Sequence, residues 1–296
     1  MKKFVRTLVA ALCICLGVVG LAACGGPKVE GKVVIRGSTS VEPLMRLMMD
    51  DYMKVGKSKV EGVEFDIECQ GSGAGRTAAQ EDKDGNVIGM SSSALTTEQA
   101  AAFDNIVTVA LDAIAVIVHS TNGVANLAIT DLYDIFTGAK TNWSEVEGSG
   151  LTGNIYVNIR EAGSGTRDAF DSLVKNAEGK NLAAATFPAN HGEHNSTNAV
   201  MTAVASNANA IGYISLGSVN STVKVLKVGG VDAKDATVLD GTYKLQRPFV
   251  LFTKKGLTLT GATQAFYSYL KSSTAQAVVK AGGFVQQLKT DMTEYK

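Results

Sequence analysis

The segment Arg-Glu-Ala-Gly-Ser-Gly-Thr-Arg at residues 160–167 determines how the rest of this chain is interpreted. It follows Gly153–Ile159, which has the composition of a strand, and precedes Asp168–Asn176, which has the pattern of a helix. A Gly-Ser-Gly-Thr turn that opens a helix directs free backbone N–H groups to one point, where the helix dipole favours negative charge. Arg160 can donate two parallel hydrogen bonds to an oxyanion there. We therefore expect an anion-binding loop after this strand.

Three more strands near the start of the chain run into Ser/Gly loops, and helices are expected from about Val41 to Val55 and from about Arg76. This alternation predicts an α/β fold with ligand-binding groups at the carboxyl ends of strands. The strands and their loops are Lys32–Arg36 with Gly37-Ser38-Thr39-Ser40, Val63–Gln70 with Gly71–Arg76, and Val87–Met90 with Ser91-Ser92-Ser93.

Two long segments rich in apolar and β-branched residues divide the chain. Ile106–His119 is longer than an average strand, and Arg247–Lys254 is a second long strand. A strand of such length can leave one domain and enter the next. We therefore predict two α/β domains joined by two crossings, with lobe I formed by residues 32–113 plus 248–296 and lobe II by residues 114–247.

The N-terminus has the features of a targeting sequence. Three basic residues precede the apolar stretch Thr7–Leu21, which is followed by Ala22-Ala23-Cys24. Small residues before a cysteine resemble a bacterial lipobox, which implies a signal peptide over residues 1–23, cleavage before Cys24, and diacylglyceryl and palmitate lipid on that cysteine. An ordinary secretory signal or an uncleaved anchor is the alternative. Residues 24–31 would then form a short tether.

Charge and cysteine content exclude some classes of function. The chain has 28 basic and 28 acidic residues, and residues 1–23 hold three of the basic ones, so the processed chain would carry a net charge of −3. Without a basic surplus, binding of nucleic acid by bulk electrostatics is not expected. Processing would leave Cys69 as the last unmodified cysteine, which permits no intramolecular disulfide, and we interpret it as a small core residue.

Eight motifs follow one another along the chain: Gly37–Leu44, Gly71–Gly75, Ile88–Ser93, Ile135–Gly138, Thr141–Ser144, Arg160–Thr166, Ala210–Tyr213 and Arg247–Phe249. Taken in this order, they resemble those of the phosphate-binding lipoproteins of bacterial phosphate ABC importers. The resemblance covers nearly all of the processed chain.

The resemblance implies a two-domain periplasmic-binding-protein fold of type II, with a ligand cleft between the lobes. It implies a monomeric, lipid-anchored extracytoplasmic receptor, more typical of a Gram-positive surface than of a periplasm, that needs no cofactor. Such a receptor delivers inorganic phosphate to ABC permease and ATPase subunits. By motif position, the phosphate-binding residues would be Ser38, Thr39, Ser40, Ser72, Gly73, Ser92, Arg160, Ser164, Gly165 and Thr166.

Two positions depart from the family pattern. Ser92 stands where many relatives carry an aspartate that accepts the phosphate proton and repels sulfate. Ala162 stands where many relatives carry an acidic residue that holds the arginine, a role that the neighbouring Glu161 could take. A receptor for another oxyanion (sulfate, molybdate or a phosphonate) therefore remains an alternative, as do a secreted phosphatase and a surface adhesin or signalling receptor.

Several other residues have ordinary structural interpretations. His191-Gly-Glu-His194 is expected in an exposed loop, and a metal there would need a third ligand. Val223–Leu239 is expected to form strands and turns. Arg167 is interpreted as a solvated or interdomain charge, whereas Arg76 could reach the cleft mouth. Trp143 is expected to anchor packing. No nucleophile elbow, phosphate-binding P-loop or zinc-protease motif is present.

Overall fold

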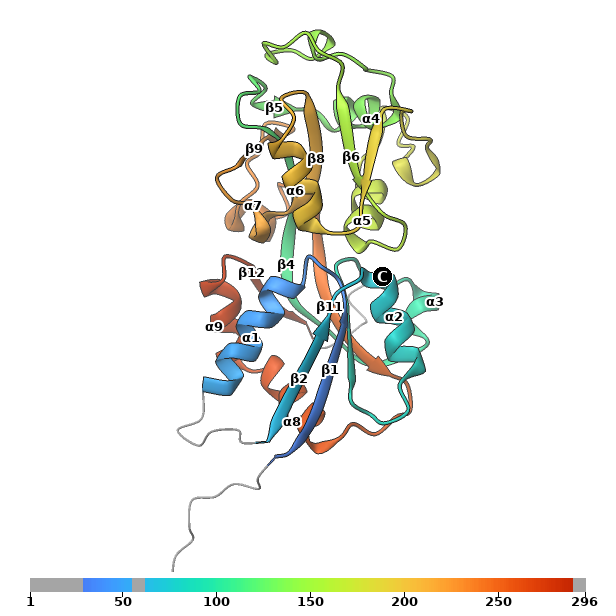
Figure 1. Cartoon of the computed structure of the whole chain (residues 1–296), viewed down its shortest axis with the longest axis vertical. Coiled ribbons are helices and arrows are strands. Elements are labelled where there is room, and N and C mark those ends of the chain that lie inside the picture. Colours follow the sequence, from blue (N-terminus) through green and yellow to red (C-terminus); the bar gives the residue numbers. More distant parts are fainter. Residues whose placement is uncertain (1–28, 55–61, 290–296) are drawn as a thin grey trace, which may run out of the picture.

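The computed structural model describes residues 29–54 and 62–289. Its two halves lie one above the other in Figure 1, and β4 (Phe103–His119) and β11 (Gln246–Lys254) run between them. The predicted signal peptide, Cys24 and most of the tether fall outside the described residues. Within the described ranges, no helix has the length and apolar composition needed to cross a membrane.

The lower half contains a mixed sheet with helices on both sides (Figure 1). Its strand order is β2-β1-β3-β11-β4; β1 is parallel to β2 and β3, whereas β11 is antiparallel to β3 and β4. The other elements of this half are β1 (Gly31–Gly37), α1 (Glu42–Lys54), β2 (Val63–Glu68), α2 (Ser72–Glu81), β3 (Val87–Ser91), α3 (Thr97–Ala100), α8 (Gly261–Leu270), α9 (Ser273–Ala281) and β12 (Val285–Lys289).

The upper half continues the same sheet in the order β4-β8-β6-β7. Trp143 is fully buried in its core and donates from Nε1 to the carbonyl of Asn209 over 2.9 Å, so it anchors packing as predicted. The elements are β5 (Asn126–Leu127), α4 (Ile129–Thr137), η1 (Trp143–Glu145), β6 (Tyr156–Arg160), α5 (Gly165–Leu173), η2 (Leu182–Ala184), β7 (His191–His194), α6 (Thr197–Ala205), β8 (Ala210–Ser215), η3 (Leu216–Ser218), β9 (Val223–Val225), β10 (Lys227–Val228) and α7 (Asp235–Leu239).

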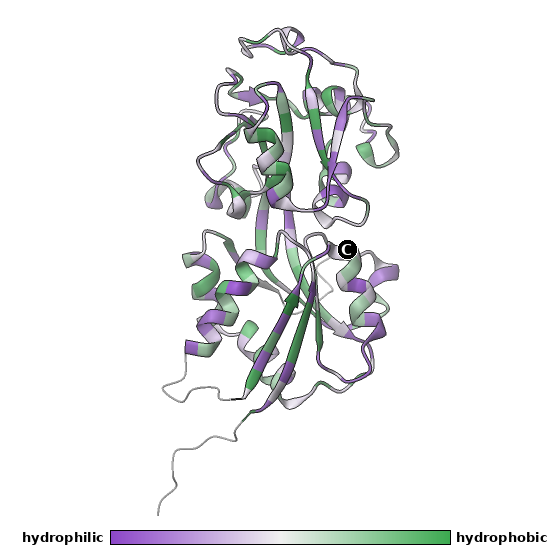
Figure 2. Ribbon diagram, in the orientation of Figure 1, coloured by the Kyte–Doolittle hydropathy of each residue, from purple (hydrophilic) through white to green (hydrophobic). Residues whose placement is uncertain are grey.

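Strand β4 belongs to both halves because its pairing changes along its length. Ala113 pairs with Gln246 of β11, whereas the next residue, Ile114, pairs with Ser215 of β8. Apolar residues are concentrated on the strands inside each half, and polar ones lie on the outer faces of the helices (Figure 2). Each half therefore has its own hydrophobic core, and two strands connect the cores.

Some sequence-based predictions of elements were wrong. Helix α2 begins at Ser72 and not near Arg76. Its glycines do not form a turn before the helix but let the helix pack closely on β1, because a Cβ on Gly75 would lie 2.8 Å from the carbonyl oxygen of Arg36. Helix α5 begins at Gly165 and not at Asp168, because Ser164 caps it.

Two other segments also differ from the prediction. His191–His194 forms strand β7 because it pairs with β6, and the segment expected to hold only strands and turns includes α7, whose Val238 is buried. Cys69 is only partly buried beside the lower core.

Candidate anion-binding site

The turn after β1 is held in place by a glycine and a serine. Gly37 has a φ of +138°, and a Cβ there would lie 2.2 Å from the carbonyl oxygen of Met90, so only glycine fits. The hydroxyl of Ser38 accepts from the backbone N–H of Ser40 (3.2 Å) and donates to Ser92 Oγ (2.8 Å). This turn presents Ser38, Thr39 and Ser40, all at least nine-tenths buried, to the upper half.

The N-terminus of α2 joins the same cluster. Ser72 Oγ accepts from the backbone N–H of Ser92 (3.1 Å) and lies 3.5 Å from Ser92 Oγ. The backbone N–H of Gly73 donates to the carbonyl of Gly163 in the upper half (2.9 Å). Gly73 is therefore not free to donate to a ligand in this structure, whereas the Ser72 and Ser92 hydroxyls line one wall of the cluster.

Helix α5 approaches this wall from the upper half. Ser164 is its N-cap, accepting from the backbone N–H of Arg167 over 3.4 Å. A Cβ on Gly165 would lie 2.4 Å from Ser72 Oγ and 2.9 Å from Ser92 Oγ. Only glycine at this position lets the helix N-terminus come so close to the lower half.

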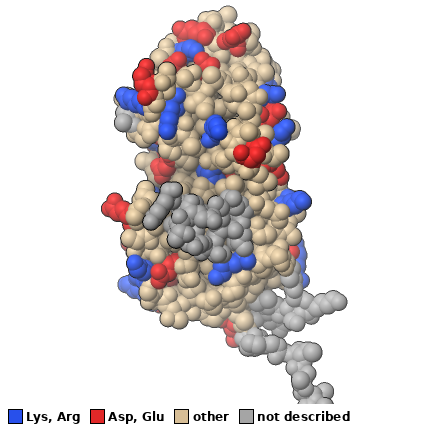
Figure 3. All heavy atoms as spheres, turned by 180° about the vertical axis from the view of Figure 1, so that it is seen from behind, with Lys and Arg blue, Asp and Glu red and all other residues tan. Residues whose placement is uncertain are grey.

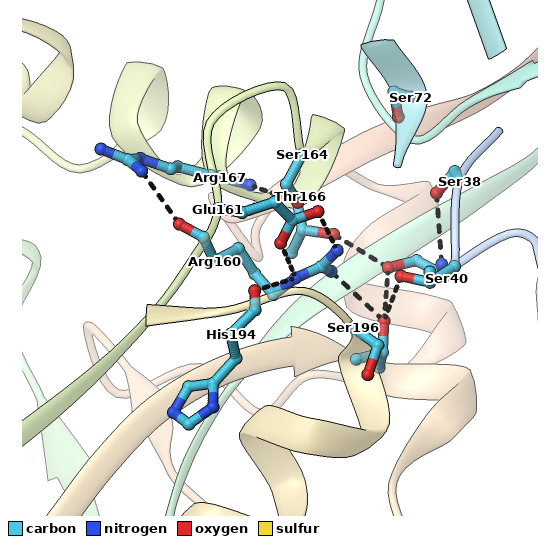
Figure 4. A network of polar contacts seen from close by, with 12 residues as sticks. Ser38, Ser40, Ser72, Arg160, Glu161, Ser164, Thr166, Arg167, His194 and Ser196 are labelled. Atoms are coloured by element: carbon cyan, nitrogen blue, oxygen red, sulfur yellow. Dashed lines mark hydrogen bonds and ion pairs between the residues drawn. The ribbon is translucent and has the colours of Figure 1, made fainter. Parts of the chain in front are cut away.

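Arg160 is the cation of the site and is 2% exposed. Its Nε and Nη2 atoms both donate to Glu161, over 2.8 Å each, and Nε also donates to the carbonyl of His194 over 3.2 Å. Figure 4 shows the guanidinium directed from β6 toward Ser40. Glu161 thus holds the arginine, as expected from its position next to Arg160. This bidentate pair offsets the cost of burying the guanidinium.

Hydroxyl contacts bridge the halves at the centre of the network. Ser40 Oγ lies 2.8 Å from Thr166 Oγ1 and 3.0 Å from Thr197 Oγ1, and Thr39 Oγ1 lies 3.3 Å from Thr197 Oγ1. Thr197 is not among the residues that the sequence motifs assigned to the site. The detectable signal was a fourth Ser/Thr-rich helix start, Ser196-Thr197, directly after a strand.

Two further arginines, Arg167 and Arg76, lie on the helices α5 and α2 that begin at the site. Arg167 points away from the network (Figure 4); it donates from Nη1 to the carbonyl of Arg160 (3.0 Å) and pairs with Asp171 and Glu193 (3.5 and 3.3 Å). It therefore serves the upper half internally. Arg76 lies on α2, where it opposes the rise in the pKa of Asp168 on α5 that burial causes.

The two histidines of β7 are engaged with protein atoms. His191 Nδ1 lies 2.6 Å from the carbonyl oxygen of Pro188, and His194 Nε2 lies 2.9 Å from Asn158 Oδ1. Burial, followed by the charge of Arg160, lowers the pKa of His194. Among the residues that the structure describes, no group of three His, Cys, Asp or Glu side chains could hold a metal ion.

This arrangement suits a tetrahedral oxyanion better than a cation or an apolar ligand. Helices α2, α5 and α6 begin at the site, and each N-terminus carries roughly half a positive charge. Since Glu161 already balances Arg160, the attraction for an anion comes from these helix ends and from the buried hydroxyls. The hydroxyls can donate to several oxygens of one ligand.

Comparison with known proteins identifies the superfamily of this chain. Residues 22–274 match the sequence model of the PBP superfamily domain. The chain belongs to the PBP superfamily. It is 43% identical to phosphate-binding protein PstS 2 of Streptococcus pneumoniae serotype 4 over 160 residues, which are 52% of each chain. The match thus spans about half the length of that relative.

Two other relatives match this chain over most of its length. Phosphate-binding protein PstS of Bacillus subtilis is 29% identical over 268 residues, covering 89% of this chain and 83% of the relative. A candidate phosphate ABC transporter substrate-binding protein from Clostridium perfringens, solved with bound phosphate, is 34% identical with a TM-score of 0.76; the match covers 87% of this chain and all of that one. The names of these relatives describe phosphate-binding and substrate-binding proteins.

Proposed function

We propose that this chain is an extracytoplasmic receptor that binds inorganic phosphate between its two halves and delivers it to an ABC permease. The observation that carries the proposal is the meeting of Ser38, Ser40 and Ser72 with the Arg160–Thr166 segment in one buried cluster. A phosphate dianion has four oxygens with several lone pairs, and short hydroxyl and amide donors can replace its hydration shell. The phosphate-binding relatives support this choice of ligand.

We propose that the residues in contact with phosphate are Ser38, Thr39, Ser40, Ser72, Ser92, Arg160, Ser164, Gly165 and Thr166. Gly73 would reach the ligand only if its hydrogen bond to Gly163 breaks. Ser92 would accept a hydrogen bond from the O–H of monohydrogen phosphate, since its hydroxyl can both donate and accept. Selectivity against sulfate would then rest on this hydrogen bond and not on repulsion by a carboxylate.

The movement that admits phosphate is proposed to be a hinge rotation. Lobe I (residues 32–113 plus 248–296) and lobe II (residues 114–247) would turn about β4 and β11, the two strands that connect their cores. Phosphate would favour the closed arrangement because only there can donors from both lobes reach one anion.

The N-terminal sequence supports the proposed location. Cleavage before Cys24 and lipid on that residue would anchor a monomeric receptor to the outer face of the cell membrane, as on a Gram-positive surface. Acidic and basic side chains are interspersed on the face shown in Figure 3, in keeping with a receptor that has no nucleic-acid partner.

Calorimetric titration of the chain from Gly25 to Lys296, stripped of ligand, tests the proposal. Phosphate should bind tightly at about pH 7–8, and sulfate should give no heat. Comparable binding of both anions would instead favour a general oxyanion receptor, and no heat from either would refute the assignment of the site. Hydrolysis of a chromogenic phosphate ester would point to a phosphatase.

A further inference from the structure

Thr197 is the first residue of α6 and lies outside the set of residues that the family motifs suggest. Its side chain is 3% exposed, and the helix that carries it is fixed by buried Val200 and Val204 against β8. Ser196 caps the helix by accepting from the backbone N–H of Ala199 (3.2 Å). The hydroxyl of Thr197 is therefore not needed to cap its own helix.

That hydroxyl instead contacts both halves of the molecule. Ser40 Oγ and Thr39 Oγ1 of the lower half lie 3.0 and 3.3 Å away, and Nη1 of Arg160 in the upper half donates over 3.5 Å. A hydroxyl has one proton and two lone pairs, and a guanidinium can only donate. Thr197 must accept from Arg160, which leaves one lone pair and one proton for the two lower-half hydroxyls. All three contacts can form at once.

Thr197 also lies at the edge of the buried cluster. Together with Thr39 it lines a hollow of about 340 Å³ between the halves, which Glu42 borders from below and Asn198 from above. The hydroxyls of Thr39 and Thr197 contact each other at this hollow, over 3.3 Å. A ligand that left on this side would have to break that contact.

We propose that Thr197 is a positioning residue that fastens the two halves over the bound anion. It would hold Arg160 and Ser40 at the positions from which they reach the ligand, and it would close the side of the cleft that faces the hollow. This inference rests on the proposed function. It predicts that Thr197 acts mainly on release of phosphate, because its contacts to Thr39 and Ser40 form only when the halves meet.

The test measures phosphate affinity and dissociation rate in Thr197→Val, which replaces the hydroxyl with a methyl group of similar size. Loss of these hydrogen bonds should weaken phosphate binding about tenfold, mostly through faster dissociation. Thr197→Ser should restore binding to within about twofold. Thr202→Val, at an exposed position of the same helix, is the matched control and should leave binding unchanged.

A double-mutant cycle separates positioning from general stability. If Thr197 acts through Ser40, the Ser40→Ala and Thr197→Val effects on affinity should be clearly less than additive. Additive effects, or unchanged dissociation in Thr197→Val while the parent chain binds phosphate, would overturn the inference and leave the proposed function intact. Failure of the parent chain to bind phosphate would overturn both. If Thr197→Val does not fold, Thr197→Ala and Thr197→Ser carry the test.

Discussion

At the scale of single residues, the site depends on pairing more than on net charge. Arg160 is buried and would be costly alone, yet Glu161 meets it with both carboxylate oxygens. The Nη1 atom of Arg160 donates to Thr197 in the hydroxyl network, and we expect this atom to be the one that meets an anion. The pair therefore orients a cation without giving the site a large positive charge.

Replacement of Arg160 by alanine should weaken phosphate binding by at least about 100-fold, because charge-assisted hydrogen bonds are lost and Glu161 keeps an uncompensated charge near the ligand. Titration calorimetry measures the change. Arg46→Ala is the control, since Arg46 is exposed and pairs with Glu42 on the same helix. An Arg160→Ala variant that binds like the parent would remove this residue from the site.

The free energy of unfolding should depend on pH because of Asp171 on α5. Burial raises its pKa from 3.8 to about 6, and the nearby Arg167 only partly opposes this. Between these values the folded chain binds a proton that the unfolded chain releases, so this contribution to stability is full at low pH and is lost as pH rises through about 6.

Asp171→Asn should therefore stabilise the fold by about 1–3 kcal/mol at pH 8, because the amide avoids burial of a charge. The gain should vanish near pH 4, where the carboxyl is neutral in the folded chain. Denaturant unfolding at both pH values checks this, with Asp232→Asn at an exposed position as control. If Asp171→Asn changed the free energy of unfolding equally at both pH values, the pKa of Asp171 would not be raised in the folded chain.

At the scale of elements, the site is built from helix starts that meet across the two halves. Helix α2 comes from below, and α5 and α6 come from above (Figure 1). The approach of α5 depends on its first residue, since Gly165 leaves no side chain between the helix end and the hydroxyls of Ser72 and Ser92.

Gly165→Ala should hold the halves apart and weaken phosphate binding by about tenfold or more, because the added Cβ would collide with two hydroxyl oxygens. Gly261 offers a matched control, since it is likewise the first residue of a helix, follows the hydroxyl-bearing N-cap Thr260, and has open space around its Cβ position. Gly261→Ala should leave affinity unchanged and raise stability by about 0.4–1 kcal/mol. Equal affinities of the two variants would refute this account of the contact.

At the scale of the whole molecule, the two crossing strands are tied by a buried ion pair. Arg247 of β11 donates from Nε and Nη2 to Asp112 of β4 (3.1 and 3.0 Å), and Ser215 of β8 donates to the other carboxylate oxygen (2.8 Å). Both charged side chains are at most 2% exposed. The pair lies where β4 passes from one half to the other, so it fixes the relative position of the strands that connect them.

Asp112→Ala should lower the free energy of unfolding by about 3–5 kcal/mol, because it leaves the Arg247 charge buried without a partner. Urea unfolding measures the loss. Asp232→Ala removes an exposed partner of Lys227 and should cost less than about 1 kcal/mol. A loss as small as that of the control would show that the crossing does not depend on this pair.

The amino-acid sequence was enough to predict which loops form the candidate site and what class of ligand they would suit. Ser/Gly turns after strands are local patterns, so Ser38, Ser72 and the Arg160–Thr166 segment could be recognised without coordinates, as could the two long crossing strands. Helix starts were less certain, because the glycines at Gly73 and Gly75 look like a turn when their packing partners are unknown.

Which of these groups meet in space became clear only from the folded chain. Thr197 joins Ser40 across 157 positions of sequence, and Asp112 joins Arg247 across 135. The close approaches that require Gly75 and Gly165 likewise involve residues from distant segments. The physical reason is that a hydroxyl or a glycine has the same local preference wherever it occurs, whereas its partner is set by how strands and helices pack. Sequence patterns therefore predicted the individual loops, and packing of the two halves assembled them into one site.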